Sequence, residues 1–258
     1  MAKEGTAMTT KSTKRLLTLG ALSCALIFSL FGTLVSTASA APMQTASASD
    51  SVVGMRVDDF ELLDHKGAAH RLYYYDDAPA IVLMVQGNGC PIVRNVMPGL
   101  RAVRDAYADK GVKFLLLNSN LQDNRTSINA EAEAFGYDIP VLVDSNQLVG
   151  EALKVSRTAE VFVIDPKSKK VVYHGPVDDR VTYEVQKEKA DNNYLANALD
   201  AVLAGESVAI ADVDSPGCII NFPENNKRDQ HADISYHDTI VPLLEQNCVG
   251  CHQVGGIG

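Results

Sequence analysis

Two predominantly apolar stretches, separated by a helical one, constrain the fold of this sequence more than any other feature. Residues 80–85 (Ala-Ile-Val-Leu-Met-Val) and 112–117 (Val-Lys-Phe-Leu-Leu-Leu) are typical of strands buried on both faces. Residues 91–110 place apolar side chains at helical spacing between them. This alternation continues along the chain and predicts an α/β sheet that is covered by helices on both faces.

The other predicted elements lie on either side of these runs. They are a hairpin over 60–63 and 71–75, a helix over 124–135, a strand over 139–143, a short helix over 148–153, a hairpin over 161–164 and 170–174, and a closing helix over 193–203. About 155 residues are enough for one sizeable core. The formal charge of −9 over 258 residues argues against a nucleic-acid partner.

The N-terminal forty residues have the pattern of a secretory signal peptide. Basic residues at 11, 14 and 15 precede the apolar stretch 16–35, and Ala38-Ser39-Ala40 provides a cleavage site. We therefore expect export to the periplasm. The alternative is an uncleaved membrane anchor, because the apolar stretch is long enough to span a bilayer. The four remaining cysteines (Cys90, Cys218, Cys248 and Cys251) would meet an oxidising compartment and should be paired, modified or redox-active.

Cys90 follows a glycine-containing loop and directly precedes Pro91, which suits the first position of a helix. The amide groups at a helix start stabilise a thiolate, and Arg94 on the same face could add positive charge. The pattern therefore indicates a nucleophilic cysteine. The alternative is a buried, inert thiol.

The order of these landmarks resembles the thioredoxin-like superfamily, and more closely its redoxin (AhpC/TSA, peroxiredoxin-like) branch. Residues 53–63 are similar to the redoxin opening, Cys90 matches the nucleophilic cysteine, and Pro98 matches the proline that kinks the active-site helix. Residues 141–144 and 158–165 match the later strands. The resemblance covers residues 52–207 and implies a three-layer α/β/α sandwich with thiol-based chemistry.

Three departures affect what the resemblance implies. Gly89 and Val93 replace the tryptophan and second cysteine of the thioredoxin motif, so the internal dithiol is missing. Leu83 and Gly87 replace the proline and threonine of typical peroxiredoxins, so that hydroxyl is missing too. Ala159 stands where the superfamily has a cis-proline facing the cysteine, and we expect a trans peptide there because a non-proline cis bond costs about 3 kcal/mol.

Two further residues are candidates for this site. Arg157, two residues before Ala159, either faces Cys90 or is a solvated surface charge. Cys218 either pairs with Cys90 in a structural or resolving disulfide or remains a separate thiol, since sequence does not give the Cα separation that a bridge requires.

Residues 248–252 (Cys-Val-Gly-Cys-His) form the attachment signature of c-type haem. Cys248 and Cys251 would form thioethers with the two vinyl groups, and His252 would be the axial iron ligand. The alternatives are a disulfide pair or zinc, and zinc would need a second ligand pair. The segment resembles the start of a cytochrome c domain, but no sixth ligand follows His252, so we expect a truncated haem segment.

The predicted organisation has five parts: a signal peptide (1–40), a spacer (41–51), the redoxin domain (52–207), a polar linker (208–235), and the haem segment (236–258), which begins with a helix over 236–247. The histidines at 65, 70, 174, 231 and 237 are expected at the solvated surface. The leading hypothesis is an exported thiol oxidoreductase or peroxidase, in which Cys90 attacks a peroxide or a protein disulfide and Cys218 or an external thiol resolves it. The alternatives are a haem electron-transfer protein with a redox partner protein, and a binding module without turnover.

Overall fold

The computed structural model describes residues 51–255. The predicted signal peptide and all but the last residue of the spacer lie outside that range. Within it, no helix is both long and apolar enough to cross a bilayer. The strands are β1 (Glu61–Leu63), β2 (Ala69–Arg71), β3 (Ile81–Val85), β4 (Lys113–Asn118), β5 (Val141–Val143), β6 (Val161–Asp165) and β7 (Lys170–Gly175). The helices are α1 (Pro91–Ala106), α2 (Arg125–Phe135), α3 (Leu148–Ala152), α4 (Tyr194–Ala204), α5 (Pro223–Gln230) and α6 (Val241–Asn247).

A five-stranded mixed sheet is the centre of the fold, with strand order β5-β4-β3-β6-β7. Strand β3 runs parallel to β4 and antiparallel to β6, and β4 runs parallel to β5. All five residues of β3 are buried, as its apolar run predicts. The predicted hairpin of β6 and β7 is confirmed, with a register shift between Val163 and Ile164.

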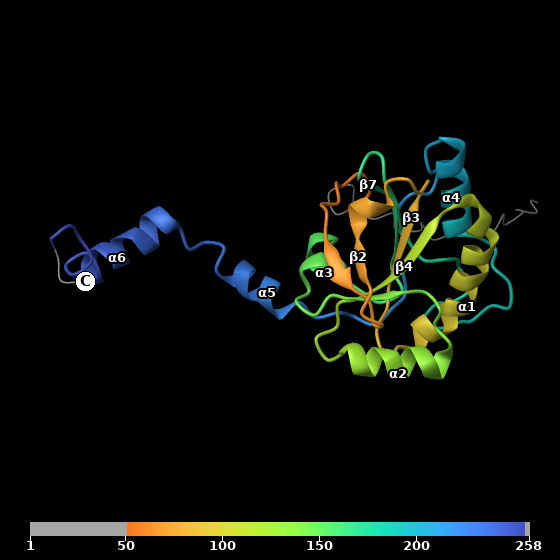
Figure 1. Ribbon diagram of the computed structural model, residues 1–258, viewed down its shortest axis with the longest axis horizontal. Coiled ribbons are helices and arrows are strands. Elements are labelled where there is room, and N and C mark those ends of the chain that lie inside the picture. The colour runs from red at the N-terminus through yellow and green to blue at the C-terminus, as the bar shows by residue number, and fades with distance from the viewer. Residues whose placement is uncertain (1–50, 256–258) are drawn as a thin grey trace, which may run out of the picture. The chain divides into compact units, whose positions relative to one another are not determined.

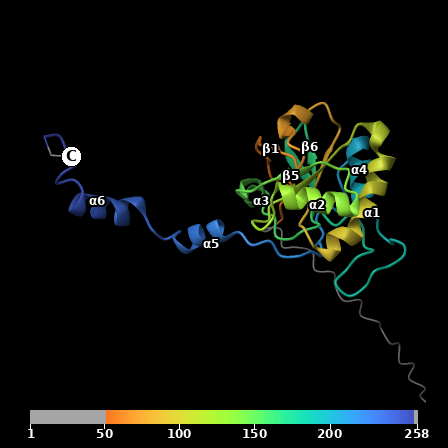
Figure 2. The ribbon, with the colours of Figure 1, turned by 60° about the horizontal axis from the view of Figure 1, so that its bottom comes forward.

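Helices cover both faces of this sheet, as predicted (Figure 1). On one face, apolar side chains of α1, α2 and α4 pack on Val82, Met84 and Leu116. On the other face, α3, the 3₁₀ turn η1 (Leu72–Tyr75) and the N-terminal residues pack on the alternate side chains of the same strands. Figure 2 shows the same separation of α3 from α1 and α4 from a second direction. The sheet therefore holds the ends of β3 and β6 rigidly, and the site is built at those ends.

Three local expectations differ from the structure. Residues 72–75, predicted as the end of a strand, form η1, and residues 108–110 form a separate 3₁₀ turn, η2 (Ala108–Lys110), after α1. Residues 211–220, predicted as part of a polar linker, run along the redoxin body and bury Ile220 to 5% exposure in its core. We call residues 211–220 the strap. After it, α5, a π-helical turn η3 (Tyr236–Ile240) and α6 contain no buried residue.

Candidate active site

Cys90 lies at the junction of β3 and α1, where the sequence places it. It is the N-cap residue of α1, Pro91 is the first helical residue, and the Cys90 carbonyl accepts the Arg94 amide at 3.2 Å. The side chain is 4% exposed. Its sulfur therefore lies beside the unpaired amide groups of the first helical turn, which favour negative charge.

Half-buried carboxylates fix the loop in front of Cys90. Asp123 accepts hydrogen bonds from the Asn88 backbone at 3.0 Å and from the Asn118 side chain at 2.8 Å. Glu131 accepts the Gly89 amide at 3.2 Å. These contacts set the approach of the chain into α1, so the position of Cys90 does not depend on the loop alone.

Gly87 is required by close packing. A Cβ at this position would lie 2.5 Å from the Asn120 side-chain nitrogen and 2.8 Å from Cγ2 of Thr158. Gly87 occupies the position that carries threonine in typical peroxiredoxins, and here Thr158 already fills the space such a side chain would need. The sequence departure at this position therefore has a steric cause.

Thr158 also places a hydroxyl group beside Cys90, where Gly87 lacks the hydroxyl that typical peroxiredoxins have. Its Oγ1 lies 3.1 Å from Cys90 Sγ, and its side chain is fully enclosed at 2% exposure. Sequence analysis did not select Thr158 because it is 68 residues from Cys90. The available signal was its position directly before Ala159, where the superfamily's loop faces the cysteine.

Ala159 adopts a left-handed backbone with φ of 63°, and its amide donates to the Val85 carbonyl at 2.7 Å. A proline fits neither feature, because its φ is fixed near −65° and it has no N–H. The replacement of the family's proline by alanine therefore agrees with the local backbone.

The strap reaches the site as an added strand. The Thr158 amide donates to the Cys218 carbonyl at 2.9 Å, and the Ile220 amide donates to the Ser156 carbonyl at 3.0 Å. The Cys218 amide in turn donates to Thr158 Oγ1 at 2.9 Å. The first residue of the strap is held at β7, where the His174 amide donates to the Ala211 carbonyl at 2.8 Å.

This arrangement brings Cys90 and Cys218 together across 128 residues, with their sulfur atoms 2.8 Å apart. Both residues are thiols in the structure. The separation is longer than the ~2.05 Å of a disulfide bond, and a small approach of the two sulfur atoms would allow that bond to form. The sequence left open whether Cys218 lies beside Cys90 or apart from it, and the structure places the two side by side. Cys90 is buried, whereas Cys218 is exposed.

The two thiols differ in acidity. Burial by itself raises the pKa of Cys90, but the adjacent Cys218 thiol and Thr158 hydroxyl, with the Val93 and Cys218 amides nearby, outweigh it, so this pKa lies below its ordinary value. Burial raises the pKa of Cys218, and the neighbouring Cys90 raises it further. The geometry thus favours a Cys90 thiolate that accepts the Cys218 S–H group.

Arg94 is less available to Cys90 than its helical position suggests. Its guanidinium forms two hydrogen bonds with Glu131, at 3.1 and 3.0 Å, and lies 4.0 Å from the centre of the Phe135 ring. Among the described residues, no hydrogen bond joins the Arg94 guanidinium to the Cys90 sulfur. Its charge acts on the sulfur through space and is largely balanced by Glu131.

Arg157 contacts the strap, and no hydrogen bond links it to Cys90 within the range that the structure describes. Its guanidinium donates to the Tyr183 hydroxyl at 3.2 Å and to the Gly217 carbonyl at 3.5 Å. The Tyr183 hydroxyl also donates to the Gly217 carbonyl at 2.8 Å and accepts the Gly217 amide at 2.9 Å. Arg157 and Tyr183 therefore hold the strap one residue before Cys218.

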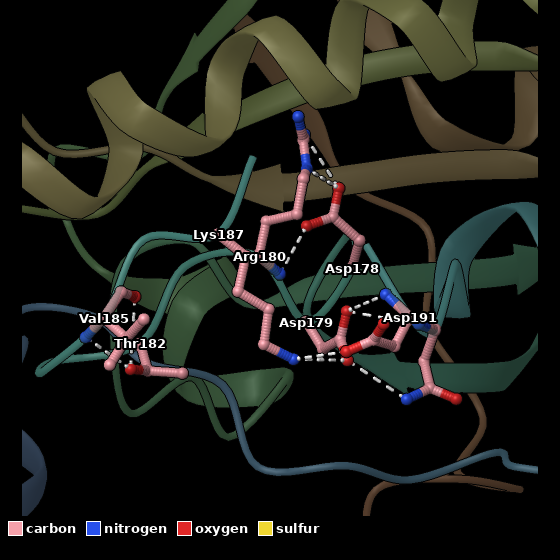
Figure 3. A network of polar contacts seen from close by, with 8 residues as sticks. Asp178, Asp179, Arg180, Thr182, Val185, Lys187 and Asp191 are labelled. Atoms are coloured by element: carbon pink, nitrogen blue, oxygen red, sulfur yellow. Dashed lines mark hydrogen bonds and ion pairs between the residues drawn. The ribbon is translucent and has the colours of Figure 1, made fainter. Parts of the chain in front are cut away.

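A polar network shapes the loop that presents Tyr183 (Figure 3). Asp179 accepts the backbone amides of Asp191 and Asn192 at 2.9 and 3.1 Å and pairs with Lys187 at 3.1 Å. Burial opposes ionisation, but these donors lower the pKa of Asp179 to about 2. Asp178 pairs with Arg180 at 2.8 Å, so both aspartates are structural.

The prediction of solvated histidines is wrong for three of the five. His65 is 2% exposed, His70 bonds to Asp64 at 3.0 Å, and His174 bonds to Asp212 of the strap at 2.8 Å. The local sequence around these histidines does not indicate their partners, because the partners come from other parts of the fold. His231 and His237 are exposed, as predicted.

Cys248, Cys251 and His252 lie together on the turn after α6. The amides of Cys251 and His252 both donate to the Cys248 carbonyl, at 3.1 and 2.9 Å. Cys251 and His252 are exposed and Cys248 is half-buried. No hydrogen bond within residues 51–255 engages these three side chains, and no three potential ligands converge on a metal-ion position in that range. One half-buried thiol, one exposed thiol and one exposed imidazole are three potential ligands, one fewer than the four that a structural zinc site requires.

Comparison with known proteins agrees with the fold. Residues 53–174 match the AhpC/TSA family. The thiol-disulfide oxidoreductase ResA of Geobacillus kaustophilus is 28% identical over 141 residues, which is 55% of this chain and 75% of that protein. The protein of the same name from Geobacillus thermodenitrificans is 30% identical over 117 residues, 45% of this chain and 66% of that protein.

Two solved structures share the architecture. A hypothetical protein from Sinorhizobium meliloti is 32% identical, with a TM-score of 0.59, and the match covers 65% of this chain and 93% of that one. An uncharacterized conserved protein from Geobacillus kaustophilus is 31% identical with the same TM-score, and the match covers 66% and 92%. The family match ends before the strap and the Cys248–His252 motif. The chain has the thioredoxin-like fold and carries, over residues 53–174, a redoxin domain of the AhpC/TSA family.

Proposed function

We propose that this protein is a thiol-disulfide oxidoreductase in which Cys90 and Cys218 cycle between two thiols and one disulfide. The observation that carries the proposal is the 2.8 Å separation of their sulfur atoms. The difference in acidity gives each cysteine a role: Cys90 is the nucleophile, and Cys218 resolves the product that Cys90 forms. The two ResA relatives are named thiol-disulfide oxidoreductases, which supports the same reaction class.

Reduction of an external disulfide takes two exchange steps. The Cys90 thiolate attacks one substrate sulfur, the substrate S–S bond breaks, and the other sulfur leaves as a thiolate. Cys218 then loses its proton and attacks the Cys90 sulfur of the mixed disulfide, which releases the second substrate thiolate. Two electrons have passed to the substrate, and the protein holds a Cys90–Cys218 disulfide. An external dithiol restores the two thiols by the reverse steps.

Mass spectrometry of the full-length protein tests this proposal. The reduced protein is treated with one equivalent of glutathione disulfide, or of hydrogen peroxide in a parallel sample, and remaining thiols are then blocked. We expect loss of two hydrogens and a Cys90–Cys218 cross-linked peptide. Cys218→Ser should accumulate the glutathione adduct at Cys90, whereas Cys90→Ser should form neither product at this site.

Two outcomes separate the alternatives. If only peroxide oxidises the pair, through cleavage of the peroxide O–O bond and a Cys90 sulfenate that Cys218 converts to a disulfide with loss of water, the protein is a peroxidase. If Cys90 remains unmodified by both oxidants, the thiol-enzyme proposal fails and the binding-module hypothesis gains support.

The same protein is proposed to carry covalent haem c on Cys248 and Cys251, with His252 as the axial ligand. Haem in that position would supply one-electron transfer, whereas the three side chains hold and orient it. The accessible thiols and the unengaged imidazole support this assignment. We expect a covalent haem spectrum in protein produced with a haem-attachment system, and its loss in Cys248→Ala/Cys251→Ala. Zinc retention without haem would overturn the assignment.

Export through cleavage after Ala40 is proposed from the signal pattern. N-terminal sequencing of the protein from an expressing bacterium should begin at Ala41. A retained N-terminus in the membrane fraction would instead indicate the uncleaved anchor.

A further inference from the structure

Thr158 connects the sulfur of Cys90 to the backbone of the strap. Its Oγ1 lies 3.1 Å from Cys90 Sγ and accepts the backbone amide of Cys218 at 2.9 Å. The Thr158 amide donates to the Cys218 carbonyl at 2.9 Å, so the strap residue is held on both sides. At 2% exposure, Thr158 is screened from water that could replace either contact.

These contacts fix the direction of the hydroxyl proton. A hydroxyl group has one proton to donate and two lone pairs to accept. The Cys218 amide occupies one lone pair, and a Cys90 thiolate has no proton to give. When Cys90 is ionised, the Thr158 proton therefore points at the Cys90 sulfur, and the amide behind it polarises the hydroxyl and strengthens that donation.

No other side-chain hydroxyl within residues 51–255 is hydrogen-bonded to Cys90. Tyr137, whose phenol lies near enough to interact electrostatically with Cys90, has a buried hydroxyl without a hydrogen-bond partner in this range. Burial, and secondarily Glu131, raise the pKa of Tyr137 to about 12, so this group stays neutral. Arg94 is bonded to Glu131. The remaining support for the sulfur comes from the first amides of α1 and from the strap.

Building on the proposed thiol chemistry, we propose that Thr158 makes the nucleophilicity of Cys90 depend on the docked strap. While the Cys218 amide is in place, the polarised hydroxyl stabilises the Cys90 thiolate. When the strap leaves, the thiolate loses the Cys218 S–H donor, and the Thr158 hydroxyl loses the amide that polarises it. The strap therefore has two functions: it brings the resolving sulfur, and its backbone activates the nucleophile. Cys90 is most reactive when its resolving partner is already present.

The first test removes the hydroxyl without removing volume. In a full-length Cys218→Ala background, which keeps the strap amide and removes its sulfur, the rate of Cys90 alkylation by iodoacetamide is followed against pH by peptide mass spectrometry. Thr158→Val should raise the Cys90 pKa and slow alkylation at neutral pH about tenfold, the effect of one pKa unit. Thr158→Ser keeps the hydroxyl and should stay within about threefold of the background. Thr158→Ala replaces the valine variant if that variant does not fold.

The second test asks whether the strap acts through Thr158. A Cβ on Gly217 would lie 1.8 Å from the Thr158 carbonyl oxygen, so Gly217→Ala displaces the strap. In the Cys218→Ala background it should raise the Cys90 pKa as Thr158→Val does. The double variant should be no slower than either single variant, since both remove the same interaction.

Equal Cys90 pKa values in the valine, serine and parent proteins would overturn the role of Thr158. Additive effects of the two substitutions would overturn the coupling to the strap. Neither result touches the proposed function, which fails separately if Cys90 in the otherwise unaltered protein does not react with disulfide or peroxide.

Discussion

Two cysteine pairs of this chain lie in opposite environments. Cys90 and Cys218 are 128 residues apart, and the sheet, the Thr158 loop and the strap bring their sulfurs to 2.8 Å. Cys248 and Cys251 are three residues apart on the turn after α6, where no residue is buried. The first pair is made by tertiary structure, and the second by spacing along one turn.

The difference teaches how surroundings decide the chemistry of a thiol. At the first pair, burial, a helix start and fixed donors make the two sulfurs unequal, as exchange within one protein requires. At the second pair, the side chains have no hydrogen-bond partners among the described residues and stay accessible to an external group. One site is preorganised, and the side chains of the other are not engaged by the described part of the chain.

The strongest test of this comparison replaces the nucleophile itself. Cys90→Ser should reduce disulfide exchange to the uncatalysed background, because the serine hydroxyl stays protonated and weakly nucleophilic. The matched Cys248→Ser/Cys251→Ser variant should keep the exchange rate of the Cys90 site. Measurement of glutathione release by both variants checks this. Equal loss in both would mean that the two pairs act as one unit.

A smaller effect is expected from matched glycine substitutions. Gly217→Ala places a Cβ 1.8 Å from a backbone oxygen, whereas a Cβ on Gly250, within the Cys-Val-Gly-Cys-His motif, meets nothing within 4 Å. Gly217→Ala should therefore slow Cys90–Cys218 disulfide formation by about 100-fold through misplacement of Cys218. Gly250→Ala should leave that rate unchanged. Stopped-flow oxidation followed by thiol quenching gives both rates, and an unaffected Gly217→Ala protein would contradict the docked strap.

The contributions of the strap and of α6 to folding stability are compared by truncating one apolar side chain in each. Ile220→Ala removes a residue that is 5% exposed in the core, and should lower the free energy of unfolding by about 2–4 kcal/mol. Leu243→Ala, on α6 at 51% exposure, should change it by less than about 0.5 kcal/mol. Urea unfolding monitored by tyrosine fluorescence compares the two. Similar losses would show that α6 is packed as firmly as the strap.

The smallest expected effect concerns pH and the first anchor of the strap. Burial lowers the pKa of His174, but Glu160 and Asp212 outweigh it, so the pKa is raised above its ordinary value. The stabilisation from the charged histidine is therefore complete below about pH 6.5 and is lost as pH rises through the raised pKa.

Asp212→Asn should weaken this pH dependence, with a change in unfolding free energy below about 1 kcal/mol. Asp229→Asn on the exposed α5 is the control and should follow the unaltered protein. Thermal unfolding at a series of pH values between 5 and 9 provides the measurement. An unchanged slope in Asp212→Asn would assign the pH dependence to other groups.

Much of the redoxin core could be predicted because its signals are local. The apolar run of β3 and the helical spacing after Pro91 each lie within a short window, and the structure confirms both. The position of Cys90 at the start of α1 follows from the same local pattern. The predictions for residues 72–75 and for the buried histidines were wrong. Propensity and polarity do not reveal which groups will pack against a given residue.

Thr158 and the strap were beyond sequence reasoning for a different reason. Thr158 is 68 residues from Cys90, and its hydroxyl reaches the Cys90 sulfur only because β6 pairs with β3. Residues 211–220 are polar enough to predict a linker, yet their backbone groups pair with those of residues 156–158 and β7. Hydrogen bonds of this kind carry no side-chain signature.

The sequence by itself determined the order of strands and helices, the cysteine at the start of a helix and the Cys-Val-Gly-Cys-His motif, because each depends on neighbours within a few residues. Only the tertiary structure decided that Cys218 meets Cys90, that Thr158 supplies the hydroxyl that Gly87 cannot, and that Glu131 engages Arg94. Those contacts join distant segments, and close packing of the whole sheet fixes them to within ångströms.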